Sequence, residues 1–228
     1  MTPIRLRPLR EAVLDALSWV LPVECVACGA PDRMLCDGCR RRMAPDPVVT
    51  TTESGIGVIA GASYSGTVQQ VILALKDGRT STASVLAPLL TAALSRADAG
   101  AGVELAPVTS TRAAMRRRGF DPVQLVLSRT GAAWARVLRP ARPHRVQKAL
   151  GRAERQQNLL GVHRARYGLE GRRFLLVDDV VTTGSTLAEA ARAIRAAGGE
   201  VVGAVAIAAT PRLGRARGSH TSSSGKRG

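Results

Sequence analysis

The fold of this chain is decided by one stretch of sequence, Phe174-Leu175-Leu176-Val177-Asp178-Asp179-Val180-Val181-Thr182-Thr183-Gly184-Ser185-Thr186. Its apolar first half predicts a buried strand, and a loop of small residues then leads into a helix expected from about 186 to 197. Backbone N–H groups at the start of a helix attract an anion, and small residues let that anion approach closely. Two adjacent carboxylates at the end of the strand can accept hydrogen bonds from neighbouring sugar hydroxyls. The stretch therefore predicts a site for a phosphorylated sugar such as a ribose 5-phosphate.

A loop without a ligand could carry parts of this pattern, because Asp-Asp can end a strand in an exposed turn and Thr, Ser and Gly often only cap a helix. Such a loop does not need two carboxylates, two threonines, a glycine and two further hydroxyls in this order. The stretch closely resembles the phosphoribosyl-diphosphate (PRPP) loop of type I phosphoribosyltransferases. On this interpretation Asp178 and Asp179 are catalytic residues that hold the ribose hydroxyls. The 5-phosphate is then bound by Thr182, Thr183, Gly184, Ser185 and Thr186.

The composition sets limits on the partners of the chain. Its 228 residues are enough for one medium domain and a small module. A hydrophobic content of 45% excludes wholesale disorder, and an aromatic content of 3% predicts a core built mainly from Ala, Val and Leu. The formal net charge of +16 implies an anionic partner. PRPP, nucleic acid and anionic membranes all satisfy that requirement, so charge alone does not choose among them.

The N-terminus is basic, but it does not resemble a signal peptide. Glu11 and Asp15 interrupt any apolar segment, and no small-residue cleavage site follows. Apolar residues between positions 6 and 20 recur instead at helical spacing, which predicts an amphipathic helix that packs on the body of the protein. No run of the sequence approaches the roughly 18 apolar residues of a membrane span. We therefore expect no membrane span and a cytoplasmic protein.

All four cysteines lie within fifteen residues as two CxxC pairs, which are Cys25, Cys28, Cys36 and Cys39. Two such pairs typically offer zinc four thiolates in a tetrahedron, because each tight turn directs two sulfurs inward. Disulfides are an alternative that a reducing cytoplasm disfavours. Redox-active pairs are a second alternative, but no thioredoxin-like βαβ pattern surrounds these cysteines. Since four sulfurs leave no open position for catalysis, we expect a structural zinc ion.

The rest of the chain alternates strands with helices, which predicts a mainly parallel α/β sheet with ligands at the carboxyl ends of its strands. Expected helices cover about 67–76, 83–96 and 121–135, and expected strands cover about 57–65, 103–105 and 201–208. A linker is expected over residues 45–54, and a short strand with a mobile loop over the basic stretch 136–166. The expected domains are an N-terminal helix and finger at 1–45, a phosphoribosyltransferase domain at 55–210 and a disordered basic tail at 211–228.

Further motifs extend the resemblance over about residues 15–210. Segments similar to those of the ComF/GntX family of phosphoribosyltransferases are Pro107-Val108, Arg118-Gly119-Phe120, Leu75-Lys76, and the set Gln147, Leu150, Arg155 and Asn158. Members of this family join a four-cysteine finger to a type I phosphoribosyltransferase fold. The resemblance implies pyrophosphate contacts from Pro107, Val108, Thr109, Arg112, Arg118 and Arg155. The chain departs from the family at Thr109, where a second proline is usual, and at Asp121-Pro122, where Asn-Gln is usual.

Two functions stay open on the sequence. The first is transfer of phosphoribose from PRPP to an unidentified nitrogenous acceptor, with Mg²⁺ neutralising the pyrophosphate. The second is a competence-type accessory protein that binds single-stranded DNA or senses PRPP without turnover, although few aromatic residues are present for base stacking. A homodimer is compatible with the fold, which often dimerises. His144 and His163 are expected at the surface, and Lys76 is expected either at the edge of the active site or as a helix-end cap.

Overall fold

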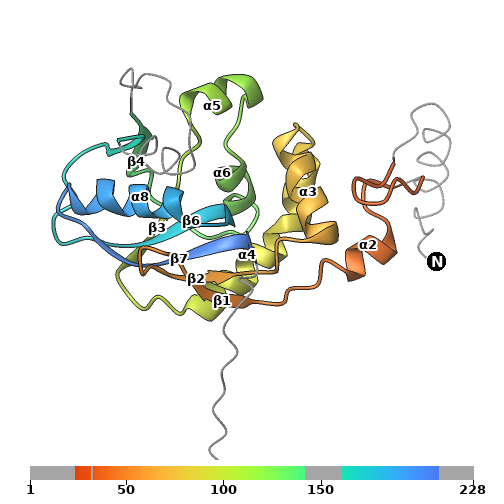
Figure 1. Ribbon diagram of the computed structural model, residues 1–228, viewed down its shortest axis with the longest axis horizontal. Helices are drawn as coiled ribbons and strands as arrows, with labels where there is room; N and C mark the ends of the chain where they lie inside the picture. The colour runs from red at the N-terminus through yellow and green to blue at the C-terminus, as the bar shows by residue number, and fades with distance from the viewer. Residues whose placement is uncertain (1–23, 32, 142–160, 211–228) are drawn as a thin grey trace, which may run out of the picture.

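The computed structural model describes residues 24–31, 33–141 and 161–210 (Figure 1). Its helices are α2 (Asp37–Arg41), α3 (Gly66–Lys76), α4 (Ala83–Ala97), α5 (Arg112–Arg118), α6 (Pro122–Leu127) and α8 (Ser185–Arg195), with a 3₁₀ turn η1 (Thr80–Thr82). Its strands are β1 (Val48–Thr51), β2 (Gly57–Ala60), β3 (Val103–Pro107), β4 (Leu138–Pro140), β5 (His163–Ala165), β6 (Arg173–Val181) and β7 (Glu200–Ala209).

Five strands form the main sheet in the order β1-β2-β7-β6-β3. All neighbouring strands in it run parallel except β1 and β2, which pair antiparallel. The mainly parallel sheet predicted from the sequence is confirmed. In the register of this sheet Val177 of β6 lies opposite Pro107 of β3, and Asp178 lies opposite Ala206 of β7. The acidic doublet therefore stands at the carboxyl edge of the sheet, where β3 has already turned into its loop.

Alternating side chains of β6 serve two hydrophobic clusters on the two faces of the sheet. Phe174 and Leu176 belong to the cluster that also contains the buried residues of α8. Leu175 and Val177 belong to the other cluster, together with the buried residues of α3, α4 and α6. This division follows from the period of two in a β-strand, and it places helices on both faces of the sheet (Figure 1).

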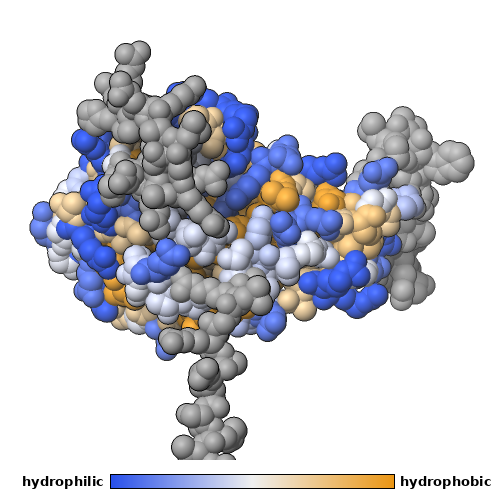
Figure 2. Space-filling model, viewed as in Figure 1, coloured by the Kyte–Doolittle hydropathy of each residue, from blue (hydrophilic) through white to orange (hydrophobic). Residues whose placement is uncertain are grey.

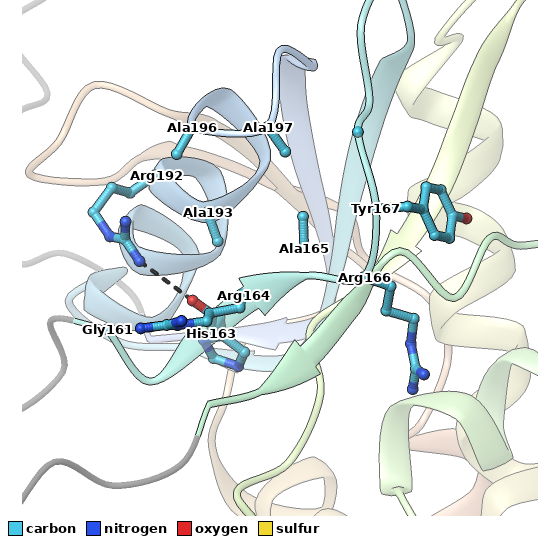
Figure 3. A pocket seen from close by; sticks show the side chains of 11 residues that line it. Gly161, His163, Arg164, Ala165, Arg166, Tyr167, Arg192, Ala193, Ala196 and Ala197 are labelled. Carbon is cyan, nitrogen blue, oxygen red and sulfur yellow. Dashed lines mark hydrogen bonds between the residues drawn. The ribbon is translucent and has the colours of Figure 1, made fainter.

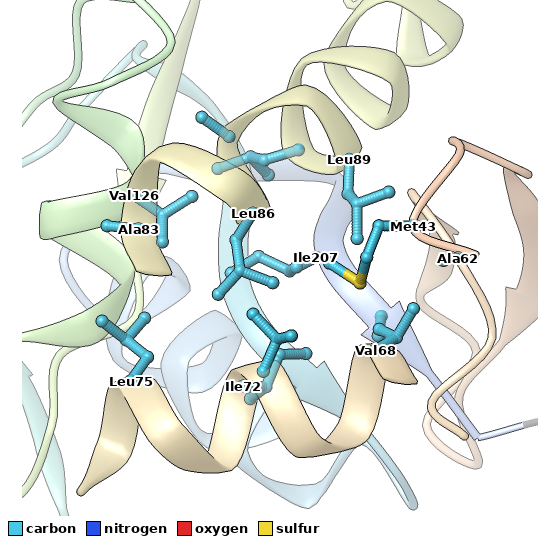
Figure 4. Close-up of a cluster of buried hydrophobic side chains, with 14 of the residues drawn as sticks. Met43, Ala62, Val68, Ile72, Leu75, Ala83, Leu86, Leu89, Val126 and Ile207 are labelled. Atoms are coloured by element: carbon cyan, nitrogen blue, oxygen red, sulfur yellow. The ribbon is translucent and has the colours of Figure 1, made fainter. Parts of the chain in front are cut away.

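The four cysteines lie in a small module, residues 24–43, whose described residues form one helix, α2. Its buried residues are Cys25, Leu35, Cys39 and Met43, and they are continuous with the α3–α4 cluster. Figure 4 shows Met43 among Val68 of α3, Leu89 of α4 and Ile207 of β7. The module is thus packed directly on the helical layer that covers one face of the sheet.

Three elements differ from the sequence predictions. The expected linker contains β1, whose residues pair with β2 from Val48 opposite Ala60 to Thr51 opposite Gly57. The helix after Asp121 ends at Leu127 rather than near residue 135, and the turn that follows uses a positive φ of 75° at Gly131. The basic stretch 136–166, where one short strand was expected, contains two, β4 and β5, which pair antiparallel.

Several predictions fall on residues outside the described ranges. These are the N-terminal helix, the part of the expected mobile loop that falls within 142–160, and the tail over 211–228. Among the described residues, no helix has the length and apolar character needed to cross a membrane.

Candidate active site

A cleft of about 460 Å³ opens at the carboxyl ends of β3 and β6. The acidic doublet, the start of α8 and the loop between β3 and α5 bound this cleft. The end of α3 and the start of β5 complete its lining. The predicted site residues that line it are Val108, Thr109, Arg118, Asp178, Asp179, Thr182 and Thr186. Residues that also line it are Tyr64, Lys76, Ser110, Thr111, Ala114, Val123, Val162, His163 and Val180.

The loop between β6 and α8 is shaped by Gly184. This residue precedes α8 with φ of +82°, a left-handed conformation that favours glycine. A Cβ at this position would overlap the side chain of Thr52, which lies buried beneath the loop. Thr52 is itself fixed, because its Oγ1 accepts a hydrogen bond from the N–H of Ile56 at 3.0 Å. The turn that joins β1 to β2 therefore supports the loop from below.

Hydrogen bonds within this loop position its hydroxyl groups. Thr183 Oγ1 and Ser185 Oγ lie 2.7 Å apart, and the N–H of Ser185 donates to Thr183 Oγ1 at 3.4 Å. Thr182 and Thr183 are both exposed, and Thr182 lines the cleft. Thr183, Gly184 and Ser185 belong to the loop without lining the cleft itself. An oxyanion that entered here would meet the first turn of α8, where backbone N–H groups lack helical partners.

The two carboxylates of the doublet have different surroundings. Asp178 is buried, and its Oδ1 accepts the backbone N–H of Asp179 at 2.8 Å. Burial raises the pKa of Asp178 to about 7, and the neighbouring charge of Asp179 acts in the same direction. Asp179 is half-buried and forms an ion pair with Lys76, whose Nζ lies 2.9 Å from Oδ2.

The opposite wall of the cleft is held by Asp121. Its buried carboxylate accepts the N–H of Ser110 at 2.8 Å, and it also accepts the N–H groups of Val123 and Gln124 at 3.1 and 3.2 Å. Asp121 is thus the N-cap of α6, as predicted, and Pro122 follows at the first helical position. The same carboxylate fixes the loop after β3, so the departure from the family at this position has a structural role.

Three buried polar side-chain atoms have no hydrogen-bond partner within the described part of the chain. They are Thr109 Oγ1, Arg118 Nε and His163 Nδ1, and all three residues line this cleft. An unpartnered buried polar group costs about 1–3 kcal/mol, so such groups are rare in native proteins. Because these three atoms cluster in one cleft, they indicate that the cleft binds a polar ligand.

The prediction that His163 lies at the surface is wrong, because only 2% of this residue is exposed. Its ring Nε2 lies 2.9 Å from the carbonyl oxygen of Thr109. A carbonyl oxygen only accepts, so Nε2 carries the proton of this hydrogen bond. The ring thereby holds the backbone of the loop after β3.

An ion pair on α8 between the buried Glu189 and the exposed Arg192 holds His163 in place. Arg192 donates from Nε and Nη2 to the carboxylate of Glu189, and its Nη2 also donates to the carbonyl oxygen of His163 (Figure 3). Glu189 accepts the N–H groups of Gly161 and His163 at 2.8 and 3.3 Å. Although burial opposes ionisation, the bonds from Arg192 and His163 lower the pKa of Glu189. The spacing of Glu189 and Arg192 on one helix was the only sequence signal for this support.

The structure does not bring every predicted residue into the cleft. Pro107 is buried at the end of β3, and Arg112 is exposed at the start of α5 without lining the cleft. Arg155 lies outside the described residues. Lys76, which was expected either at the edge of the active site or as a helix-end cap, lines the cleft, and so does His163, which was expected at the surface.

The four cysteine sulfurs lie within 4.8 Å of one another, which places them to bind a metal ion. Burial opposes ionisation of Cys25, but hydrogen bonds from the backbone of Cys36, Ala27 and Cys28 lower the pKa of its thiol to about 6. Burial instead raises the pKa of Cys39 to about 12, so the four thiols do not all ionise on their own. A bound cation would favour the thiolate form of all four. The set of four sulfur donors is typical of structural zinc.

Comparisons with known proteins agree with this geometry. The model of a family described as "Phosphoribosyl transferase domain" matches residues 71–222. The chain is 31% identical over 181 residues to the "DNA utilization protein YhgH" of Escherichia coli strain K12, which covers 74% of this chain and 76% of that protein. It is also 41% identical over 64 residues to the orotate phosphoribosyltransferase of Pyrobaculum aerophilum, which covers 27% of this chain and 33% of that enzyme.

Proposed function

The chain belongs to the family of phosphoribosyl transferase domain proteins, and from that membership we propose that it binds PRPP and transfers the phosphoribosyl group to a nitrogenous acceptor. The predicted ComF/GntX resemblance and the type I fold behind a four-cysteine cluster are confirmed at this level. The proposal for PRPP rests on one observation above all. The unpartnered Thr109 Oγ1 and Arg118 Nε line the same cleft as the acidic doublet.

Each part of PRPP has matching hydrogen-bonding groups in the cleft. The ribose hydroxyls would donate to the carboxylates of Asp178 and Asp179, and the 5-phosphate would accept from the loop at Thr182–Thr186. The diphosphate would accept from Thr109 and Arg118, which the sequence predicted as pyrophosphate contacts. Mg²⁺ would neutralise part of the charge of the diphosphate, since it prefers substrate oxygens and waters to an all-protein cage.

The reaction would form a bond between the acceptor nitrogen and C1 of the ribose while the bond from C1 to the diphosphate oxygen breaks. The electron pair of the broken bond leaves with the diphosphate, and positive charge develops on the ribose ring. The carboxylates beneath the ring favour that positive charge, and the donors of the opposite wall favour the departing anion. The cleft orients the two reactants and stabilises their separating charges.

The test is Asp179→Asn, which keeps the shape of the side chain and removes its charge. Because a hydrogen bond to a charged group is worth about 1.5–3 kcal/mol, PRPP should bind about tenfold to a hundredfold more weakly in calorimetry. The matched control is Asp77→Asn, which removes an exposed carboxylate at the end of α3 outside the cleft. An unchanged affinity for PRPP in Asp179→Asn would refute the role of the doublet. Pyrophosphate release in a screen of bases and amines would then identify the acceptor.

We further propose that the metal of the cysteine module is zinc and that its role is structural. All four positions of a tetrahedral ion are supplied by sulfur, and the buried residues of the module continue into the core. The module takes no part in the catalytic step of this mechanism.

A second function, binding of single-stranded DNA, is favoured by α5. This helix buries no residue, and four of its seven residues are arginines, Arg112, Arg116, Arg117 and Arg118. The surface over α5 is hydrophilic in Figure 2. A relative carries the name "DNA utilization protein". Salt-dependent binding of an oligonucleotide that survives deletion of residues 211–228 would support this function. Binding that disappears with the deletion would place the DNA contact in the tail instead.

A further inference from the structure

We propose that Lys76 is a substrate-contacting cation that changes partners during binding. It pairs with Asp179 in the ligand-free protein and passes to the diphosphate when the ribose hydroxyls engage Asp179. This inference rests on the proposed binding of PRPP. It adds a residue from α3, an element outside both predicted ligand loops, to the catalytic machinery.

The position of Lys76 supports contact with a ligand. Its Nζ lies 2.9 Å from Asp179 Oδ2, and the side chains of the two residues are 24% and 16% exposed. Lys76 lines the cleft together with Thr109 and Arg118 of the opposite wall. Among the described residues, it is the only cation that forms an ion pair with either carboxylate of the doublet.

The alternative role, capping the end of α3, is already filled by the backbone. The N–H of Asp77 donates to the carbonyl oxygen of Leu73, that of Gly78 donates to Leu75, and that of Arg79 donates to Ala74. These are the carbonyl groups that a helix end leaves without helical partners. The ammonium of Lys76 is therefore free to act in the cleft.

The chemistry of PRPP explains why the ion pair must rearrange. Ribose hydroxyls are donors, and so is an ammonium, so both compete for the oxygens of Asp179. The diphosphate is attached to C1, the carbon next to the one that carries the 2-hydroxyl. A hydroxyl that reaches Asp179 therefore brings the diphosphate close to Lys76. The flexible stem of lysine lets Nζ follow the stronger anion while its charge stays in the cleft.

The new contact would also act on the reaction. When the bond from C1 to the diphosphate oxygen breaks, its electron pair adds negative charge to that oxygen. An ammonium already placed beside the leaving group stabilises this charge without a proton transfer. Lys76 would thereby contribute to the transition state as well as to the binding of the substrate.

Three ligands separate this role from a structural one. Calorimetry would measure the binding of PRPP, inorganic pyrophosphate and ribose 5-phosphate, each with Mg²⁺, to the wild type and to Lys76→Met. We expect PRPP and pyrophosphate to bind about tenfold to a hundredfold more weakly, which corresponds to one lost charge-assisted hydrogen bond. Ribose 5-phosphate should bind as well as before or more tightly, because nothing competes for Asp179.

Two controls accompany the variant. Arg79→Met removes one exposed positive charge from the same end of α3 without touching the cleft, and it should leave all three affinities unchanged. Lys76→Arg keeps the charge and should recover part of the pyrophosphate affinity. Thermal melting of both Lys76 variants reports whether the fold is intact.

The outcomes are distinct. Pyrophosphate binding that is unchanged in Lys76→Met would overturn the inference, and so would an equal loss for ribose 5-phosphate. If the wild type binds neither PRPP nor ribose 5-phosphate, the proposed function itself fails, and the inference fails with it.

Discussion

The cysteine module and the loop between β6 and α8 are both recognisable from short sequence patterns, yet they are held in place by different means. The loop ends a strand that lies between two neighbours in the sheet, and the turn at Thr52 supports it from below. The described residues of the module, 24–31 and 33–43, contain one five-residue helix and no strand. The module depends on the sulfur cluster and on its packing against α3 and α4. A rigid sheet can therefore hold a ligand loop, whereas we expect so small a module to need a bound metal ion to hold its shape.

One helix joins these two regions. At its first turn, Thr67 of α3 accepts a hydrogen bond from Arg42 of the module at 3.1 Å. At its last turn, Lys76 of α3 reaches Asp179 in the cleft. We therefore ask how far a disturbance in one of these regions affects the other.

The largest effect is expected from removing a metal ligand with Cys36→Ser. The zinc content should fall, and the protein should lose on the order of several kcal/mol of stability, since metal binding supplies folding free energy to such a module. Elemental analysis and thermal melting measure these two quantities. If wild-type protein purified without chelators contains no zinc, the proposed structural zinc site is wrong. If PRPP affinity falls along with the zinc content, the two regions are coupled through α3.

Gly184→Ala tests the other region, and it should cost about 2–3 kcal/mol because of the positive φ and the overlap with Thr52. Binding of PRPP should weaken while the zinc content stays unchanged. The same substitution in a Thr52→Gly background should be milder, since glycine lacks both Thr52 carbons, Cγ2 and Cβ, that the new Cβ would meet. Equal losses in both backgrounds would show that the backbone conformation alone is responsible.

Asp178, in the ligand region, should make its own contribution to the pH dependence of stability. The pKa of Asp178 is raised from 3.8 to about 7, so the folded protein holds a proton there that the unfolded chain releases. This contribution to stability is full below about pH 4 and is lost as the pH rises through about 7. Asp178→Asn cannot titrate and should lack the decline. Melting temperatures across this range would show it, and parallel curves for the two proteins would contradict the assignment to Asp178.

The smallest effect is expected from Arg42→Met, which removes the bonds from Arg42 to Thr67 and to Cys39 Sγ. An exposed hydrogen bond contributes about 0.5–1.5 kcal/mol, so the melting temperature should fall slightly. Arg41→Met, a change of the neighbouring exposed arginine, is the matched control. A decrease in PRPP affinity confined to Arg42→Met would show that the docking of the module adjusts the position of α3.

Local patterns predicted much of this protein. The strand, loop and helix around Asp178, the helix that ends at Lys76, and the clustered cysteines are each encoded within a few neighbouring residues. The errors arose where local signals were weak. Residues 48–51 carry a Thr-rich sequence that is typical of a linker, and only pairing with β2 makes them a strand.

The sequence by itself determined the chemistry of the parts, namely a carboxylate pair beside a hydroxyl-rich loop and four sulfurs at metal-binding spacing. The tertiary structure alone decided which distant groups meet them. It brings Lys76 into an ion pair with Asp179, packs Thr52 close to Gly184, and lets His163 form a hydrogen bond with the loop after β3. The physical reason is that hydrogen-bonding groups and turn residues act over a few positions of the chain. Contacts between elements depend instead on the register of the sheet and on how helices pack against it, which no local pattern records.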